Sequence, residues 1–231
     1  ISSSMASRIM RVFTFLRFMR QILKSSPADL DWIQSQGLLA VKLAQIFALR
    51  SDLISVEKCR QLQQLYQHAS SIPSEDVFRN IEQRAPEGFI DAFEHIDDVP
   101  LAAASVGQVH RARLKDGQEV VIKVIKAQNE KTFRRDVNRM RRWLRVFLIF
   151  MPKLRKVGNP VALLNHVADY TTRELDLRNE IKGAEELLRI KEEVSGNFQM
   201  DLLRFPKYYR ELSNKDILVS EFGRGDSLED G

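Results

Sequence analysis

The pattern of apolar and polar positions predicts a β-hairpin near the middle of the chain. Residues 106–112 alternate between apolar and polar side chains, although without a clean apolar face, and residues 120–125 are rich in β-branched side chains. Asp116-Gly117 between them favours a tight turn, because glycine tolerates positive φ. Lys123 interrupts the second apolar run, where leaving an ammonium unpaired would be costly. The predicted hairpin therefore carries one charged side chain in an otherwise apolar strand.

Helical patterns precede this hairpin. The spacing of apolar residues predicts helices over 9–23, 37–50, 55–68 and from Ser74 to about Ala85. Asp29 or Asp31 is expected to cap the second of these helices, after a break at Ser26-Pro27. Ser74 is expected to cap the fourth, with two acidic residues in its first turn.

Two further patterns follow the hairpin. Residues 132–156 are strongly basic and apolar and predict a helix. Its arginines form either the solvated side of a helix with one buried face or a second membrane-facing patch. A second hairpin is expected to pair residues 207–212 with residues 217–220 across a four-residue turn.

A long helix is predicted between these two segments. Asn159-Pro160 provides a capping asparagine and a proline suited to the first helical position. If this helix continues without a break, Asp176 and Glu180 share one of its faces. For Glu174, a surface ion pair with Arg178 is the simple alternative to a functional role.

The charge distribution is uneven. The chain has 36 basic and 31 acidic residues, and residues 1–24 contain five of the bases and no acid. The remaining chain is therefore balanced, so the net charge of +5 does not describe a nucleic-acid-binding surface, and no nucleic acid is expected as a partner. Three interpretations of the first helix remain open: an interfacial helix attracted to anionic lipid, a core-packing helix with arginines at its rim, or the remnant of a mitochondrial presequence.

Composition excludes several classes of site. Cys59 is the one cysteine, which excludes an internal disulfide, and the four histidines lack metal-ligand spacing, so no metal site is expected. No apolar run reaches the roughly 18 residues that a membrane span needs. The chain begins at Ile1 and ends at Gly231 in a loop-like stretch, which predicts a fragment cut at both ends.

One predicted helix carries a polar pair on an apolar background. Lys42 and Gln45 are three positions apart in the segment 37–50, so they lie on one face of that helix. A lysine whose stem is buried and whose ammonium reaches solvent is the common alternative to a functional role.

The segment around the hairpin resembles a known family. Residues 102–110, Ala-Ala-Ala-Ser-Val-Gly-Gln-Val-His, with the strand lysine behind them, resemble the N-terminal lobe of the UbiB-like (ADCK/AarF) atypical kinases of ubiquinone biosynthesis. The family differs from ordinary kinases in having an alanine-rich loop in place of a glycine-rich one. Three more family signatures occur in order: Lys42-x-x-Gln45 with Ala44 where the family has glycine, Glu174-x-Asp176 followed by Glu180, and a hinge-like Glu221-Phe222-Gly223.

The resemblance implies two groups of site residues. Nucleotide-binding residues are expected at Ala102, Ala103, Ala104, Ser105, Lys123, Glu180, Glu221 and Gly223. In that arrangement Lys123, held by Glu180, neutralises the α- and β-phosphates, the loop covers them, and the hinge backbone binds adenine. Catalytic roles are expected at Lys42, Gln45, Glu174 and Asp176, with Glu174 reaching Lys42.

The resemblance also implies the architecture. The expected fold is α+β, a protein-kinase-like N-terminal lobe with a small antiparallel sheet and an N-terminal helical extension. The expected boundaries are a basic helix over 1–25, the extension over 26–98 and the lobe over 99–231, without the C-terminal lobe. The expected ligand is ATP or ADP with Mg²⁺, whose metal ligands belong to that C-terminal lobe, so this chain alone is not expected to catalyse.

The implied role is that of an atypical kinase or ATPase that supports quinone biosynthesis. It would act on a small molecule or in a lipid-linked process, because the Lys42 helix would block a peptide site. The expected partners are an adenine nucleotide, an anionic membrane surface and quinone-biosynthesis proteins, at a bacterial inner membrane or a mitochondrial or plastid membrane. The alternative from another class is a basic, lipid-binding, non-catalytic interaction module built on a kinase-like lobe.

Overall fold

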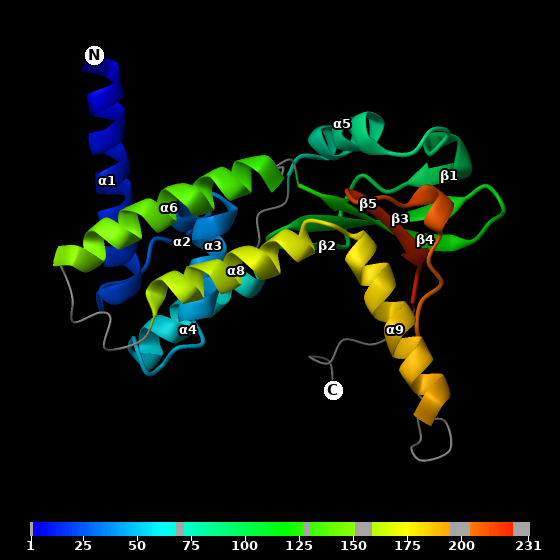
Figure 1. Cartoon of the computed structure of the whole chain (residues 1–231). Helices are drawn as coiled ribbons and strands as arrows, with labels where there is room; N and C mark the ends of the chain where they lie inside the picture. The colour runs from blue at the N-terminus through cyan, green and yellow to red at the C-terminus, as the bar shows by residue number, and fades with distance from the viewer. Residues whose placement is uncertain (1, 68–71, 127–129, 151–158, 195–203, 224–231) are drawn as a thin grey trace. The chain divides into compact units, whose positions relative to one another are not determined.

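The computed structural model describes residues 2–67, 72–126, 130–150, 159–194 and 204–223. The chain divides into two compact units, each built from two separate stretches of sequence (Figure 1). The first unit combines residues 1–70 with 128–172, and the second combines residues 71–127 with 173–231.

The first unit is helical. Its elements are α1 (Ser2–Leu23), α2 (Leu30–Ser35), α3 (Leu38–Phe47), α4 (Val56–Gln67), α6 (Glu130–Phe150) and most of α8 (Pro160–Glu174). α3 forms the centre of the unit, because most of its side chains are buried. Asp29 caps α2 by accepting a hydrogen bond from the Trp32 backbone N–H at 3.0 Å. The predicted cap therefore forms on a separate short helix, because the helix predicted over 37–50 is α3, whose cap position is Gly37. Gly37, with φ 94°, then allows the sharp turn into α3.

α1 has a buried side and an exposed apolar side. Phe15, Phe18 and Ile22 are buried, and the ring of Phe15 meets the edge of Phe147 in α6 with centroids 5.7 Å apart. Phe13, by contrast, is 67% exposed. The helix therefore packs into the unit, as one of the three interpretations predicts, and still presents apolar surface to its surroundings.

The second unit contains an antiparallel sheet. Its strands are β1 (Phe93–Ile96), β2 (Ala102–Ala103), β3 (Gly107–Leu114), β4 (Glu119–Ile125) and β5 (Ile217–Glu221), in the order β1-β3-β4-β5 with β2 paired to β3. β3 and β4 pair from Gly107 opposite Ile125 to Arg113 opposite Glu119, which confirms the first predicted hairpin. Gly117 has φ 86° in the connecting turn, as the Asp-Gly dipeptide requires.

One face of this sheet forms the core of the unit. α5 (Ser74–Arg84) lies along this side of the sheet (Figure 1). The buried cluster between them consists of Val77, Ile81, Phe89, Phe93, Ala112, Leu114, Val120, Ile122, Val124, Tyr209, Ile217 and Val219. The even-numbered residues of β3 and β4 supply this face, because successive side chains of a strand point to opposite sides.

The predicted long helix after Asn159-Pro160 is wrong in its second half. Asn159 does cap α8, since its Oδ1 accepts a hydrogen bond from the Ala162 N–H at 3.0 Å. The helix ends at Glu174, however, and a new helix, α9 (Arg178–Val194), begins four residues later. Leu175 and Leu177 are both buried, and the Leu177 N–H donates to the Lys215 carbonyl at 2.9 Å, so tertiary contacts hold the break. Asp176 and Glu180 therefore do not share one helical face.

Two smaller predictions are also corrected. Residues 207–212 do not form a strand, because η3 (Arg210–Leu212) is a 3₁₀ turn and only Tyr208 forms a β-bridge, opposite Ser220. β5 pairs with β4 instead. Ser74 is the first residue of α5 and makes no capping hydrogen bond, because Pro73 occupies the cap position.

The predicted α+β fold is confirmed, since helices and a small antiparallel sheet make up the chain. The basic helix predicted over 132–156 is α6, and residues 151–156 of that prediction lie outside the described residues, as does His68. Among the helices of the described residues, none is long and apolar enough to cross a membrane.

Candidate functional site

The face of the sheet opposite α5 is only partly covered. The register places Lys123 between Val109 and Leu218, and places Val121 beside it on the same face, because cross-strand partners and alternate residues of a strand point the same way. Val109, Val121 and Lys123 are half-buried, whereas their neighbours on the core face are fully buried. This half-open apolar surface around a lysine is the candidate site.

An ion pair joins the site to α9. The Lys123 ammonium donates to Oε1 of Glu180, a residue 57 positions away in the sequence. Glu180 lies in the first turn of α9, where the positive end of the helix dipole favours a carboxylate. Both side chains are partly exposed, 30% for Lys123 and 43% for Glu180, so the pair contributes at most about 1 kcal/mol to stability. Its value lies in fixing the position and direction of the ammonium.

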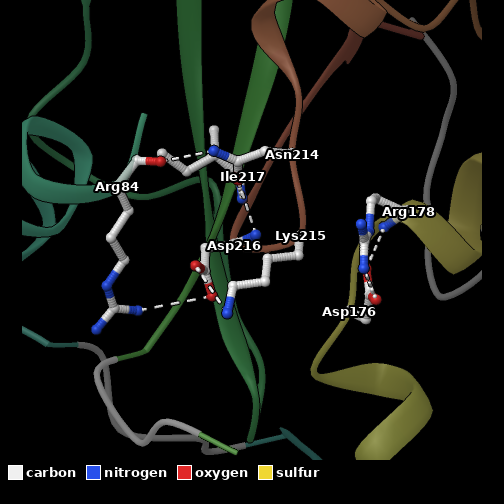
Figure 2. A network of polar contacts seen from close by, with 7 residues as sticks. All are labelled: Arg84, Asp176, Arg178, Asn214, Lys215, Asp216 and Ile217. Carbon is white, nitrogen blue, oxygen red and sulfur yellow. Dashed lines mark hydrogen bonds and ion pairs between the residues drawn. The ribbon is translucent and has the colours of Figure 1, made fainter. Parts of the chain in front are cut away.

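The start of α9 is fastened by a polar network (Figure 2). The Arg178 guanidinium pairs with the Asp176 carboxylate at 2.6 Å and 2.8 Å, and the Arg178 backbone N–H also donates to it at 3.2 Å. These hydrogen bonds hold the pKa of Asp176 below its ordinary value. Asp176 thus stabilises the break before α9, and the alternative pairing of Glu174 with Arg178 is not the one formed.

The turn before β5 is fastened to α5 by a second set of contacts (Figure 2). The Asn214 amide donates to the Arg84 carbonyl at 2.6 Å, and its Oδ1 accepts from the N–H groups of Asp216 and Ile217 at 2.8 Å and 3.0 Å. Because the adjacent Lys215 carbonyl binds Leu177, this turn connects the sheet to the segment that leads into α9.

The alanine loop is a tight turn at the edge of the site. Ala102 and Ala103 form β2, and the Ala104 N–H donates to the Gly107 carbonyl at 2.8 Å to close the turn. Gly107 is required here by close strand approach, since a Cβ atom would lie 2.9 Å from the Val124 carbonyl oxygen. Lys126, which the sequence motifs did not single out, donates its ammonium to the Ala104 carbonyl at 2.5 Å.

The Gln-Val-His segment after this loop has a structural role. Gln108 and His110 are fully buried on the core face. Gln108 accepts from the Ile72 N–H at 2.9 Å, so its amide NH₂ faces the His110 Nε2 at 3.1 Å, and the Nδ1–H of His110 donates to the Asp97 carbonyl at 2.7 Å. Gln108 therefore connects β3 to Ile72 before α5, and His110 connects it to Asp97 directly after β1.

The hinge-like segment continues from β5. The Glu221 N–H donates to the Lys207 carbonyl at 2.8 Å, and the Phe222 N–H donates to the Glu119 carbonyl at 3.1 Å. The Arg111 guanidinium lies over the Phe222 ring at 4.9 Å from its centroid. Gly223 follows as the last described residue of the segment.

Lys42 and Gln45 lie in the first unit. Gln45 is buried and its amide donates to the Leu65 carbonyl at 3.0 Å, while the Tyr66 hydroxyl donates to the Gln45 carbonyl at 2.9 Å. Gln45 therefore links α3 to α4. The Lys42 ammonium lies 5.8 Å from the centroid of the Tyr170 ring. The expected reach of Glu174 to Lys42 stays a prediction.

Acidic and thiol groups do not gather into a metal centre within the described part of the chain. No group of three or more His, Cys, Asp or Glu side chains there is placed to hold a metal ion.

Comparison with known proteins connects this geometry to relatives. A family model described as an ABC1 atypical kinase-like domain matches residues 64–231. AarF domain-containing protein kinase 1 of Xenopus laevis is 31% identical over 190 residues, which cover 82% of this chain and 35% of that protein. A probable protein kinase UbiB of Pseudomonas paraeruginosa is 31% identical over 193 residues, covering 82% of this chain and 34% of its own.

The chain spans about a third of the length of these two relatives. A solved structure, the complex of Rv3197 with erythromycin from Mycobacterium tuberculosis, matches 97% of this chain and 50% of that chain, with a TM-score of 0.49 and 19% identity.

Proposed function

Because the chain belongs to the ABC1 atypical kinase-like family, which includes the UbiB kinases, we propose that it forms the nucleotide-binding part of an atypical kinase or ATPase. The observation that carries this proposal is the ion pair between Lys123 and Glu180 on the half-open face of the sheet. A lysine held by a helix glutamate next to a small-residue loop is the arrangement with which kinase lobes bind nucleotide phosphates.

Each part of the site has a distinct task in this proposal. Lys123 neutralises the α- and β-phosphates, and Val109 and Val121 offer an apolar surface to adenine. Backbone groups of residues 221–223 other than the N–H groups of Glu221 and Phe222, which bind the Lys207 and Glu119 carbonyls, hydrogen-bond the edge of the base. The loop of residues 102–105 covers the phosphates. The apolar surface, the cation and the loop fit an adenine nucleotide.

Mg²⁺ accompanies the nucleotide in the proposal. It would balance phosphate charge when bound, and the family resemblance assigns its ligands to the C-terminal lobe. The residues of this chain bind and orient the nucleotide.

The acceptor of the proposed reaction is a small molecule or a lipid-linked substrate in quinone biosynthesis, whereas the names of the relatives say protein kinase. The roles of Lys42, Gln45, Glu174 and Asp176 as catalytic residues belong to the same proposal.

A calorimetric titration tests the nucleotide site. The protein at the full length of its relatives is titrated with Mg-ADP, and Lys123→Met is compared with Lys115→Met, in which the exposed lysine of the β3–β4 turn is changed. Loss of the Lys123 ammonium is expected to weaken binding at least tenfold, because a charge-assisted contact to phosphate is removed. Equal affinities of wild type and Lys123→Met would refute the proposed site.

A membrane surface is the second proposed partner, and a specific observation favours it. Phe13 and Leu16 of α1 and Val146 and Ile149 of α6 are exposed apolar side chains on helices rich in arginine. Such helices bind anionic lipid by combining apolar insertion with charge attraction. A bacterial inner membrane or a mitochondrial or plastid membrane would supply this surface.

Flotation with vesicles tests this partner. Phe13→Ser is expected to reduce binding to vesicles that contain phosphatidylglycerol, whereas Val99→Ser, which changes an equally exposed residue of the second unit, leaves binding unchanged. Equal flotation with purely zwitterionic vesicles, or no flotation at all, would contradict the proposal.

A further inference from the structure

Lys126 makes two contacts with the loop between β2 and β3. Its ammonium donates to the Ala104 carbonyl at 2.5 Å, and its backbone N–H donates to the Val106 carbonyl at 2.9 Å. The residue follows directly after β4, in which Lys123 is the site lysine. One residue therefore holds two of the carbonyl groups of the loop from the end of the neighbouring strand.

These contacts determine which way the loop amides point. In a planar trans peptide the carbonyl and the following N–H point in opposite directions. Because the carbonyls of Ala104 and Val106 are turned toward Lys126, the N–H groups of Ser105 and Gly107 are turned away from it. A backbone N–H group that points out of the loop in this way can donate to an anion such as phosphate.

The support beneath the loop is rigid. Gly107 pairs with Ile125, and the strands approach so closely here that a Cβ atom on Gly107 would lie 2.9 Å from the Val124 carbonyl oxygen. The end of β4 therefore cannot shift relative to the loop without disturbing the ladder. Lys126 is consequently attached to a fixed strand, and the loop is the part that it restrains.

The chemistry of the Lys126 ammonium suits it to hold the loop carbonyl of Ala104. A hydrogen bond from an ammonium to a carbonyl is charge-assisted and stronger than a neutral one. Lys126 is half-buried, and burial lowers the pKa of its ammonium. Residues 102–107 all have negative φ, since positive φ occurs among the described residues only at Gly37, Gly88 and Gly117. Alanine can therefore adopt the backbone conformation of this loop without strain.

We propose that Lys126 is a positioning residue that holds the alanine loop with the amides of Ser105 and Gly107 directed to the phosphates of a nucleoside diphosphate or triphosphate. The inference rests on the proposed nucleotide-binding function. It assigns Lys126 a task distinct from that of Lys123: Lys123 contacts the phosphates, and Lys126 acts through the loop.

The test separates phosphate recognition from base recognition. ADP and adenosine are titrated into the full-length protein for wild type, Lys126→Met, Lys126→Arg and the Lys115→Met control. Lys126→Met is expected to weaken ADP binding about tenfold and to leave adenosine binding unchanged, since the loop faces only the phosphates. Lys126→Arg restores most of the ADP affinity because a guanidinium can also donate to the Ala104 carbonyl. Hydrogen exchange of the Ala104 amide, which donates to the Gly107 carbonyl within the loop, rises in Lys126→Met, while the β4 amides keep their protection and report an intact fold.

The outcomes distinguish the two proposals. If Lys123→Met loses ADP binding and Lys126→Met does not, the positioning role is wrong and the nucleotide site stands. An equal loss of ADP and adenosine in Lys126→Met would mean that Lys126 merely stabilises the lobe. Absence of ADP binding in the wild-type protein would overturn the proposed function together with this inference.

Discussion

Replacement of Gln108 by leucine tests the structural explanation of the Gln-Val-His segment. Gln108 is fully buried and exchanges hydrogen bonds with the backbone of Ile72, its Oε1 accepting at 2.9 Å and its NH₂ donating at 3.3 Å. The same NH₂ faces Nε2 of His110 at 3.1 Å. Leucine has a similar volume and no polar atoms, so Gln108→Leu removes the hydrogen bonds and leaves the packing nearly unchanged.

The expected cost follows from the groups that lose their partners. The half-buried Ile72 N–H would lose its acceptor and the buried His110 Nε2 would lose its donor, at about 1–3 kcal/mol for each group. The apolar leucine side chain recovers about 1 kcal/mol of this through burial. Gln108→Leu should therefore lower the free energy of unfolding of the second unit by about 1–5 kcal/mol.

Native-state hydrogen exchange is the suitable assay, because the two units can be read separately. Trp32 and Trp143 both lie in the first unit, so tryptophan fluorescence reports that unit and serves as an internal control. The amides of β3 and β4 report the second unit. A loss of 3 kcal/mol corresponds to a roughly hundredfold fall in their protection. Gln83→Leu makes the same substitution at an exposed position of α5 and should change protection little.

One result would refute the reasoning. If Gln108→Leu and Gln83→Leu show the same strand protection, the buried amide does not hold the segments together, and the Gln-Val-His segment needs a functional explanation. A fall in tryptophan-monitored stability alone would be equally inconsistent, because the contacts lie in the second unit.

Four further substitutions are expected to change the free energy of unfolding in a defined direction. Gly107→Ala should cost about 1–3 kcal/mol, because the new methyl group would meet a strand carbonyl, whereas Gly183→Ala in α9 meets nothing within 4 Å and should stabilise by about 0.5–1 kcal/mol, both measured by urea unfolding. In the folded protein the ion pair with Arg178 lowers the pKa of Asp176, and Asp176→Asn removes this pair. The pair contributes about 0.5–1 kcal/mol to the free energy of unfolding above the ordinary aspartate pKa of about 3.9, and this contribution is lost as the pH falls through the lowered pKa. The stability difference between wild type and Asp176→Asn should therefore shrink in acid, and a difference independent of pH would contradict this. Leu62→Ala should cost about 2–5 kcal/mol in tryptophan-monitored unfolding, since this side chain is fully buried in the first unit.

Local features of the fold were predictable from neighbouring residues. The β3–β4 hairpin follows from a strand pattern on each side of Asp116-Gly117, and the caps at Asp29 and Asn159 follow from side chains that reach backbone N–H groups two or three residues ahead. The family was also predictable, because its signatures occur in order along the chain, and the comparisons confirm it.

Contacts between distant segments decided the parts that the sequence pattern missed. The helical pattern from Pro160 onward contains no proline or glycine at Leu175–Leu177, yet the chain leaves the helix there because both leucines are buried and Leu177 binds the carbonyl of Lys215. The first arm of the predicted second hairpin is shorter than predicted: residues 207–209 hydrogen-bond to β5, but the chain turns into the 3₁₀ helix η3 at Arg210.

The features of the site also separate into those set by neighbouring residues and those set by tertiary contacts. The sequence by itself determined that Lys123 would stand in an apolar strand and that a small-residue loop would precede it, since both depend on neighbours within a few positions. The family resemblance implied the pairing of Lys123 with Glu180, but periodicity and spacing did not, and the tertiary structure brings the two together across 57 positions. Only the tertiary structure placed the Lys126 ammonium at the Ala104 carbonyl. The physical reason is that periodicity and turn chemistry act over a few residues, whereas the partner of a buried or half-buried charge is decided by which segments the core brings together.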